Sequence, residues 1–149
     1  MGQINIGQHV KCLIACGGRL VAAGTGDNTK VTGTTIDRRQ TQGIASSLVL
    51  AVGYSGTIAN TKTLSFAVER QQSSDGTTWD TAEVIQAETV AVTSTADGAY
   101  SGVVEFDQDL AGCKQFVRYN VTPNLSAAGT DTAEWHAVAV LGGTPQIPV

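Results

Sequence analysis

The chain has 149 residues, a length that suits one domain. Apolar residues make up 42% of it, charged residues only 15%, and the formal net charge is −4. This acidic balance excludes sequence-independent binding to nucleic acid, which needs a basic face. The low share of charged residues is unusual for a freely diffusing monomer and indicates a surface that meets other protein. No run of 18 apolar residues occurs, so the sequence predicts no membrane span.

Residues 1–42 hold scattered apolar residues, Ile4 and Ile6 among them, separated by glycine-rich stretches. No part of this segment keeps a helical period for three turns. One interpretation is an extended N-terminal arm that lies across a neighbour and pairs its backbone with a foreign sheet edge. The other is that these residues are the first strands of the domain that follows. On the first interpretation, deletion of residues 1–32 leaves a folded domain.

Asp37, Arg38 and Arg39 stand side by side near the end of this segment. Adjacent residues of a strand point to opposite faces, so one arginine can face its own chain and the other a partner. Arginine suits bidentate pairing with carboxylates. These three residues, with Ile4 and Ile6, are therefore candidate contacts with another protein, and the alternative is a solvated surface cluster.

Residues 43–149 carry the strand signals, ending in a short extended tail. The stretch 63–85 is the clearest: Leu64, Phe66 and Val68 alternate with polar residues, a Ser-Ser-Asp-Gly turn follows, and then comes Trp79. We expect a hairpin with Trp79 folded over the core, so that Trp79→Ala costs about 3–5 kcal/mol.

Further strands are expected around residues 46–52, 83–95, 100–106, 116–121 and 134–141. The predicted core residues are Leu64, Phe66, Val68, Trp79, Phe116, Tyr119 and Trp135. About seven short strands with frequent turn signals predict an antiparallel β-sandwich. The last strand is apolar on both faces, as is typical of a central strand.

Residues for chemistry are few. A Ser-His-Asp triad could use only His9 or His136, and we expect the second to be structural because it lies mid-strand beside a tryptophan. Three cysteines, Cys12, Cys16 and Cys113, have neither disulfide nor zinc spacing, which is consistent with a reducing cytoplasm during synthesis. The sequence thus predicts no enzyme, no catalytic residue, no metal and no cofactor.

Six segments carry a resemblance: residues 35–39, 46–52, 63–70, 73–79, 115–119 and 138–143. In this order they resemble the capsid cement, or decoration, proteins of tailed bacteriophages. The resemblance spans about residues 33–143. It implies an all-β, antiparallel jelly-roll-like β-sandwich. It also implies a place on the outer surface of the virion, where the protein binds the major capsid protein. The extended N-terminal arm before residue 33 is not covered by the resemblance and rests on the residues alone.

Two functions follow as hypotheses. The first is a structural virion protein that stabilises the head and forms a homo-oligomer, a trimer or alternatively a dimer. The second is a carbohydrate- or receptor-binding module of a head fibre or adhesin. A sugar platform needs two or three coplanar aromatic rings, and most of the few aromatic residues here are assigned to the core.

Overall fold

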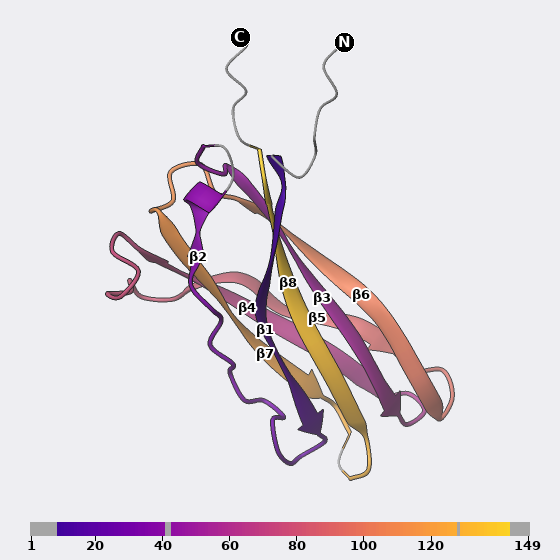
Figure 1. The fold of residues 1–149 in the computed structure, drawn as a ribbon. Coiled ribbons are helices and arrows are strands. Elements are labelled where there is room, and N and C mark those ends of the chain that lie inside the picture. Colours follow the sequence, from indigo (N-terminus) through magenta and orange to yellow (C-terminus); the bar gives the residue numbers. More distant parts are fainter. Residues whose placement is uncertain (1–8, 41–42, 128, 144–149) are drawn as a thin grey trace, which may run out of the picture.

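The structure, a computed structural model, describes residues 9–40, 43–127 and 129–143. Two four-stranded antiparallel sheets pack face to face (Figure 1). The strands are β1 (Lys11–Val21), β2 (Ile36–Asp37), β3 (Ser47–Ile58), β4 (Thr63–Ser73), β5 (Glu83–Thr93), β6 (Gly98–Asp109), β7 (Phe116–Leu125) and β8 (Thr132–Gly142), with a 3-10 turn, η1 (Arg38–Gln40), after β2. The predicted all-β antiparallel sandwich is confirmed.

The strand order identifies the fold more closely. One sheet runs β1-β8-β3-β6 and the other β2-β7-β4-β5, with every pairing antiparallel. Along the chain, the backbone crosses repeatedly from one sheet to the other. Eight strands arranged in this way form a jelly roll. The edge strands β1 and β2 share one side of the sandwich, and the edge strands β5 and β6 share the other.

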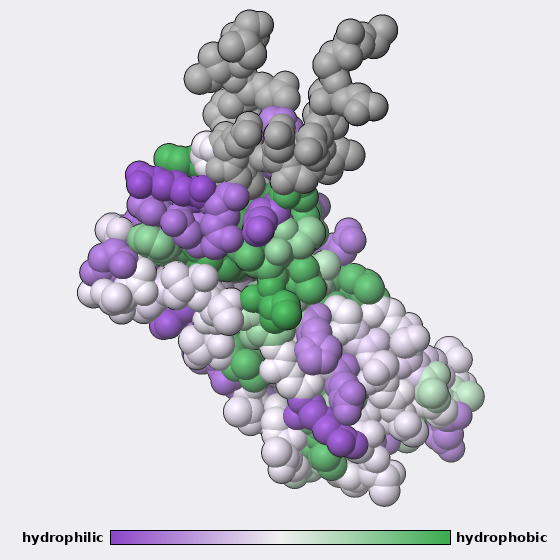
Figure 2. Space-filling view, viewed as in Figure 1, coloured by the Kyte–Doolittle hydropathy of each residue, from purple (hydrophilic) through white to green (hydrophobic). Residues whose placement is uncertain are grey.

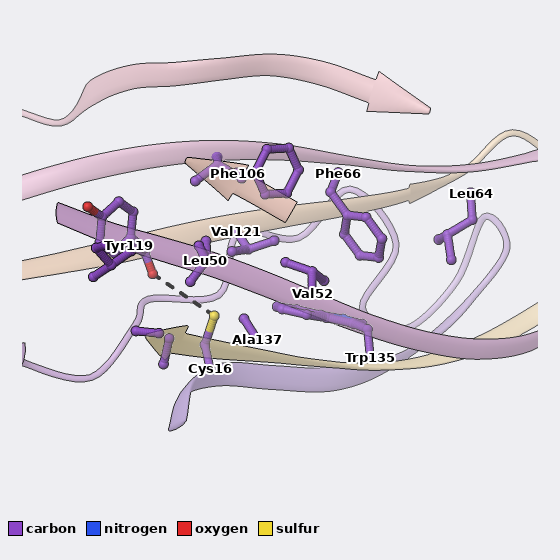
Figure 3. Packing of buried hydrophobic residues seen from close by; sticks show 14 of the residues in the cluster. Cys16, Leu50, Val52, Leu64, Phe66, Phe106, Tyr119, Val121, Trp135 and Ala137 are labelled. Carbon is purple, nitrogen blue, oxygen red and sulfur yellow. Dashed lines mark hydrogen bonds between the residues drawn. The ribbon is translucent and has the colours of Figure 1, made fainter. Parts of the chain in front are cut away.

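The core lies between the sheets. Alternation along β3 turns Leu50 and Val52 inward, and Phe66 of β4 and Tyr119 of β7 face them from the other sheet (Figure 3). The ring centroids of Phe66 and Trp135 are 5.8 Å apart at an interplanar angle of 56°, a favourable tilted arrangement. Leu64 and Val68 are also completely buried. The two sheets are thus joined by aromatic packing at their centre.

The first described residues belong to the sandwich. β1 pairs with β8 along its whole length and buries Ala15, Cys16 and Leu20 in the core. The expected division at residue 42 is therefore wrong for residues 11–40, while Ile4 and Ile6 lie outside the described residues. The physical reason is a bulge between Ile14 and Cys16, which shifts the register and so breaks the period-two pattern that marks a strand in a sequence.

The connection from β1 to β2 closes one side of the sandwich. Val31 forms a bridge with Val121 of β7, which extends the short pairing of β2. The backbone N–H of Thr34 donates to the carbonyl of Ala15 in β1 at 2.8 Å. Because this segment bonds to both sheets, it covers the β1–β2 side with backbone hydrogen bonds.

The turn between β4 and β5 is built on Asp75. Its carboxylate accepts hydrogen bonds from the backbone N–H groups of Thr77 and Thr78, at 2.8 and 2.7 Å, and from the Ser73 hydroxyl. These bonds, with the Thr78 N–H the strongest, hold the pKa of Asp75 well below its usual value. Gly76 follows with φ of 77°, a conformation that favours glycine. The predicted Ser-Ser-Asp-Gly turn is therefore held by local hydrogen bonds to its aspartate and first serine.

Trp79 lies outside the core, contrary to the sequence-based interpretation. Its side chain is half-buried, and the guanidinium carbon of Arg118 lies 4.2 Å from its ring centroid. Phe116, also predicted to be a core residue, is likewise only half-buried. Arg118 alternates with the inward-facing Val117 and Tyr119, so Trp79 packs on the outer face of β7.

We therefore expect Trp79→Ala to cost only about 1 kcal/mol, the loss of an exposed cation–π contact and some packing. Trp135→Ala should cost about 3–5 kcal/mol because it leaves a cavity at the centre of the core. Urea denaturation of both variants compares the two values. Equal losses would show that the Trp79 ring reaches the core.

Candidate interaction surface

The outer face of the β1-β8-β3-β6 sheet carries an apolar patch. Residues directly opposite each other in antiparallel strands point to the same face. Two such rows, Ile14–Val138–Ala51 and Cys12–Val140–Val49, cross three strands. The neighbours of these residues in sequence, among them Leu50 and Ala139, are buried inward, so both rows point outward.

We call this set the outer apolar patch: Cys12, Ile14, Val49, Ala51, Val138 and Val140. Figure 2 shows hydrophobic residues gathered over β1, β8 and β3 in the half of the sandwich near the first described residues. Ile14 is 74% exposed. A contiguous apolar area on a sheet face typically marks a site of contact with another molecule.

Polar groups bound the patch. Towards the other end of the same face, Arg19 and Glu134 form an exposed ion pair at 3.7 Å. On β6, three exposed carboxylates follow one another at every second position, at residues 105, 107 and 109. An apolar centre with a polar rim is the usual anatomy of a protein–protein interface.

A shallow depression of about 420 Å³ lies on the same face, near the end of β3. Its lining residues are Ser55, Gly56, Thr57, Ala99, Tyr100 and Ser101. The Tyr100 hydroxyl donates to the carbonyl of Ala96 at 2.8 Å, so this hydroxyl is already engaged within the chain. The depression is therefore a hydroxyl-lined hollow towards the other end of this face from the patch.

The outer face of the other sheet is different in kind, because its polar side chains bond to one another. Arg118 Nε donates to Gln71 Oε1 at 2.9 Å. The Glu88 carboxylate accepts hydrogen bonds from Ser65 and from Asn124, and these bonds, the one from Ser65 first, hold its pKa below the usual value. The two faces of the sandwich thus differ, and the apolar one is the candidate interaction surface.

Arg38 is not available to a partner. It is only 5% exposed, and its Nε donates to the carbonyl of Ala45 at 2.9 Å. One terminal nitrogen donates to the carbonyls of Cys113 and Lys114. The hypothesis that Arg38 contacts carboxylates of another protein is therefore wrong, because its guanidinium is buried and bonded to backbone carbonyls of its own chain.

Asp37 and Arg39, the two neighbours of Arg38 in sequence, differ from each other in their contacts. A carboxylate oxygen of Asp37 accepts from the backbone N–H of Arg39 at 2.9 Å and from Gln115 Nε2 at 3.2 Å. The Arg39 side chain is exposed. Of the adjacent pair, only Arg39 can therefore reach another molecule. The sequence predicts that one arginine faces its own chain and the other a partner, but not which of the two.

Other predicted site residues are placed as follows. The described residues contain no group of three or more His, Cys, Asp or Glu that could hold a metal ion. All three cysteines are free, and burial raises the pKa of Cys16 to about 12. His136 is exposed on the outer face of β8. No helix in the described ranges has the length and apolar character that a membrane span requires.

Comparison with models of known protein families finds no match, and neither does comparison with curated protein sequences. Solved structures are similar in fold. The match with the structure of T=1 particles derived from infectious bursal virus covers 91% of this chain and 31% of the matched chain, with 12% identity and a TM-score of 0.50. The match with the structure of the infectious bursal disease virus Gx strain covers 89% of this chain and 31% of the matched chain, with 14% identity and a TM-score of 0.48. The chain spans about a third of those proteins, and the likeness concerns the fold alone.

Proposed function

We propose that this chain is a structural virion protein, a bacteriophage capsid cement or decoration protein without enzymatic activity. It binds the major capsid protein on the outside of the head and stabilises the shell. The observation that carries the proposal is the outer apolar patch, a contiguous apolar area on one sheet face, whereas polar side chains bond to one another on the other. The jelly roll is compatible with it, since viral capsid domains use this architecture.

The patch is suited to a surface that exists in many copies. Burial of apolar area supplies about 25 cal/mol per Å², and repeated sites on a shell add avidity. The turn η1, with Arg39, lies at the same end of the sandwich as the patch (Figure 1). Asp37 and Arg39 thus form a charged margin for the interface, and Ile4 and Ile6 are proposed as further contacts. A homo-oligomer, trimeric or dimeric, presents several patches at once.

The test is co-sedimentation with heads that lack the protein. Ile14→Asp places a charge within the patch, on its β1 side, and should lower binding at least about tenfold, while the free energy of unfolding changes by about 0.5 kcal/mol or less at so exposed a site. Val84→Asp is the matched control, because Val84 is 65% exposed but lies on the other sheet. Full decoration of heads by the Ile14 variant would refute the proposal.

A second candidate is a carbohydrate- or receptor-binding module of a head fibre or adhesin. The depression near Ser55 and Thr57 favours it, because its hydroxyls match those of a sugar. Jelly rolls also serve as lectins. Glycan binding that survives Ile14→Asp but is lost in a combined Ser55→Ala and Thr57→Val variant would support this candidate over the first.

A further inference from the structure

The two sides of the sandwich differ in whether a further segment bonds to the edge strands. On the β1–β2 side, the connecting segment bonds to both sheets, through Val31 and Thr34. On the opposite side, within the residues described, β6 pairs with β3 alone and β5 pairs with β4 alone. Each of these edge strands presents a row of backbone N–H and C=O groups without a strand partner.

Of the two, β6 is the regular edge. β5 departs from register with β4 at three places, and such irregularities twist an edge away from further pairing. β6 pairs with β3 over twelve consecutive positions, from Gly98 to Asp109, without any shift. Its sequence contains neither lysine nor proline, the residues that commonly protect an edge. A long, regular edge without lysine or proline is a template for an added strand.

Charge is segregated along β6. The outward residues in its first half are uncharged: Ala99, Ser101 and Val103. Those in its second half are all acidic: Glu105, Asp107 and Asp109. Like charges directly opposite each other on neighbouring strands destabilise a pairing. This distribution disfavours a parallel copy of β6, whose carboxylates would lie side by side, and suits an antiparallel copy.

We infer that β6 pairs antiparallel with β6 of a second copy of this chain, about a two-fold axis near Val104. In this register Glu105 lies opposite Val103 of the second copy, and Asp107 lies opposite Ser101. No carboxylate then faces another. Val103, which is 64% exposed, becomes flanked by a strand. The two β1-β8-β3-β6 sheets join into one sheet of eight strands, held by main-chain hydrogen bonds.

The two-fold axis stands perpendicular to the joined sheet, so both outer apolar patches face the same way. A dimer of this kind presents two identical patches on one surface. With two patches, the dimer binds with avidity to any partner surface on which the matching site is repeated. The inference itself concerns the isolated protein and does not rest on the proposed function. Shell binding and self-association can therefore fail independently.

The experiment uses substitutions of opposite sign at Ser101, which faces Asp107 of the other copy twice in each dimer. Ser101→Lys should lower the dimer Kd about fivefold, and Ser101→Asp should raise it about fivefold or more, from two cross-strand charge pairs. Sedimentation equilibrium at low salt over a concentration series gives the Kd, and thermal melting confirms that both variants fold. Gln86→Lys and Gln86→Asp, on the exposed β5 edge, are matched controls that should leave the Kd unchanged.

Hydrogen exchange gives a second readout: amides of β6 should gain protection as concentration rises, while those of β5 should not. A protein that stays monomeric at high micromolar concentration would overturn the inference. So would a dimer or trimer whose Kd shifts in the same direction, or not at all, in both Ser101 variants. Sensitivity to Gln86 instead of Ser101 would place the contact on β5 and equally overturn it.

Discussion

Deletion of residues 1–32 is expected to abolish cooperative folding. The deletion removes β1, and with it the strand pairing along one whole edge of β8. It also removes Ala15, Cys16 and Leu20 from the core. A buried leucine alone contributes about 1.5–3 kcal/mol, and the whole free energy of unfolding of a domain is only about 5–15 kcal/mol. The exposed edge of β8, rich in valine and alanine, would then promote aggregation.

Circular dichroism and thermal melting of the truncated chain measure this effect. A matched pair of variants in the full chain isolates the contribution of β1: Leu20→Asp places a charge in the core, whereas Ile14→Asp places one on the exposed face of the same strand. Only the first should unfold the protein. A truncated chain that melts cooperatively with a native spectrum would show that residues 1–32 are a separable arm after all.

The sequence predicts those strands whose alternation is unbroken. In β4, Leu64, Phe66 and Val68 keep strict period two and all lie in the core. The sequence leaves two interpretations open for β1, an arm or a strand of the domain. Its bulge shifts the phase of the alternation, and Gly17 and Gly18 are typical of a loop. In the structure Gly17 is a strand residue: a Cβ there would lie 2.5 Å from Nδ1 of His136. Glycine in this strand reflects a close side-chain approach, which only the fold reveals.

The outer apolar patch shows a different limit. The sequence-based interpretation took the apolar residues on both faces of the last strand as evidence of a central strand, and β8 is central within its sheet. A central strand of a two-layer sandwich nevertheless buries only one face. Val138 and Val140 therefore point outward. Their exposure depends on the number of layers in the fold, and the alternation along a single strand does not reveal that number.

Arg38→Ala is expected to lower the free energy of unfolding by about 3–4 kcal/mol, whereas Arg39→Ala should change it by about 0.5 kcal/mol or less. The Arg38 guanidinium bonds to the carbonyls of Ala45, Cys113 and Lys114, which tie the end of β2 to the segment between β6 and β7. Truncation removes these charge-assisted hydrogen bonds from the three backbone carbonyls. Arg39 is the adjacent residue with the same chemistry, but its side chain is exposed.

Urea denaturation of the two single variants decides the matter, with Arg38→Lys as a third. Lysine keeps the charge but lacks the planar fork that serves several carbonyls at once, so it should recover only part of the loss. Head binding adds an independent readout, because Arg39→Ala should weaken it without a change in stability if Arg39 lies at the margin of the interface. Equal stability of the Arg38 and Arg39 variants would mean that the contacts of Arg38 with the three carbonyls contribute nothing to the free energy of unfolding.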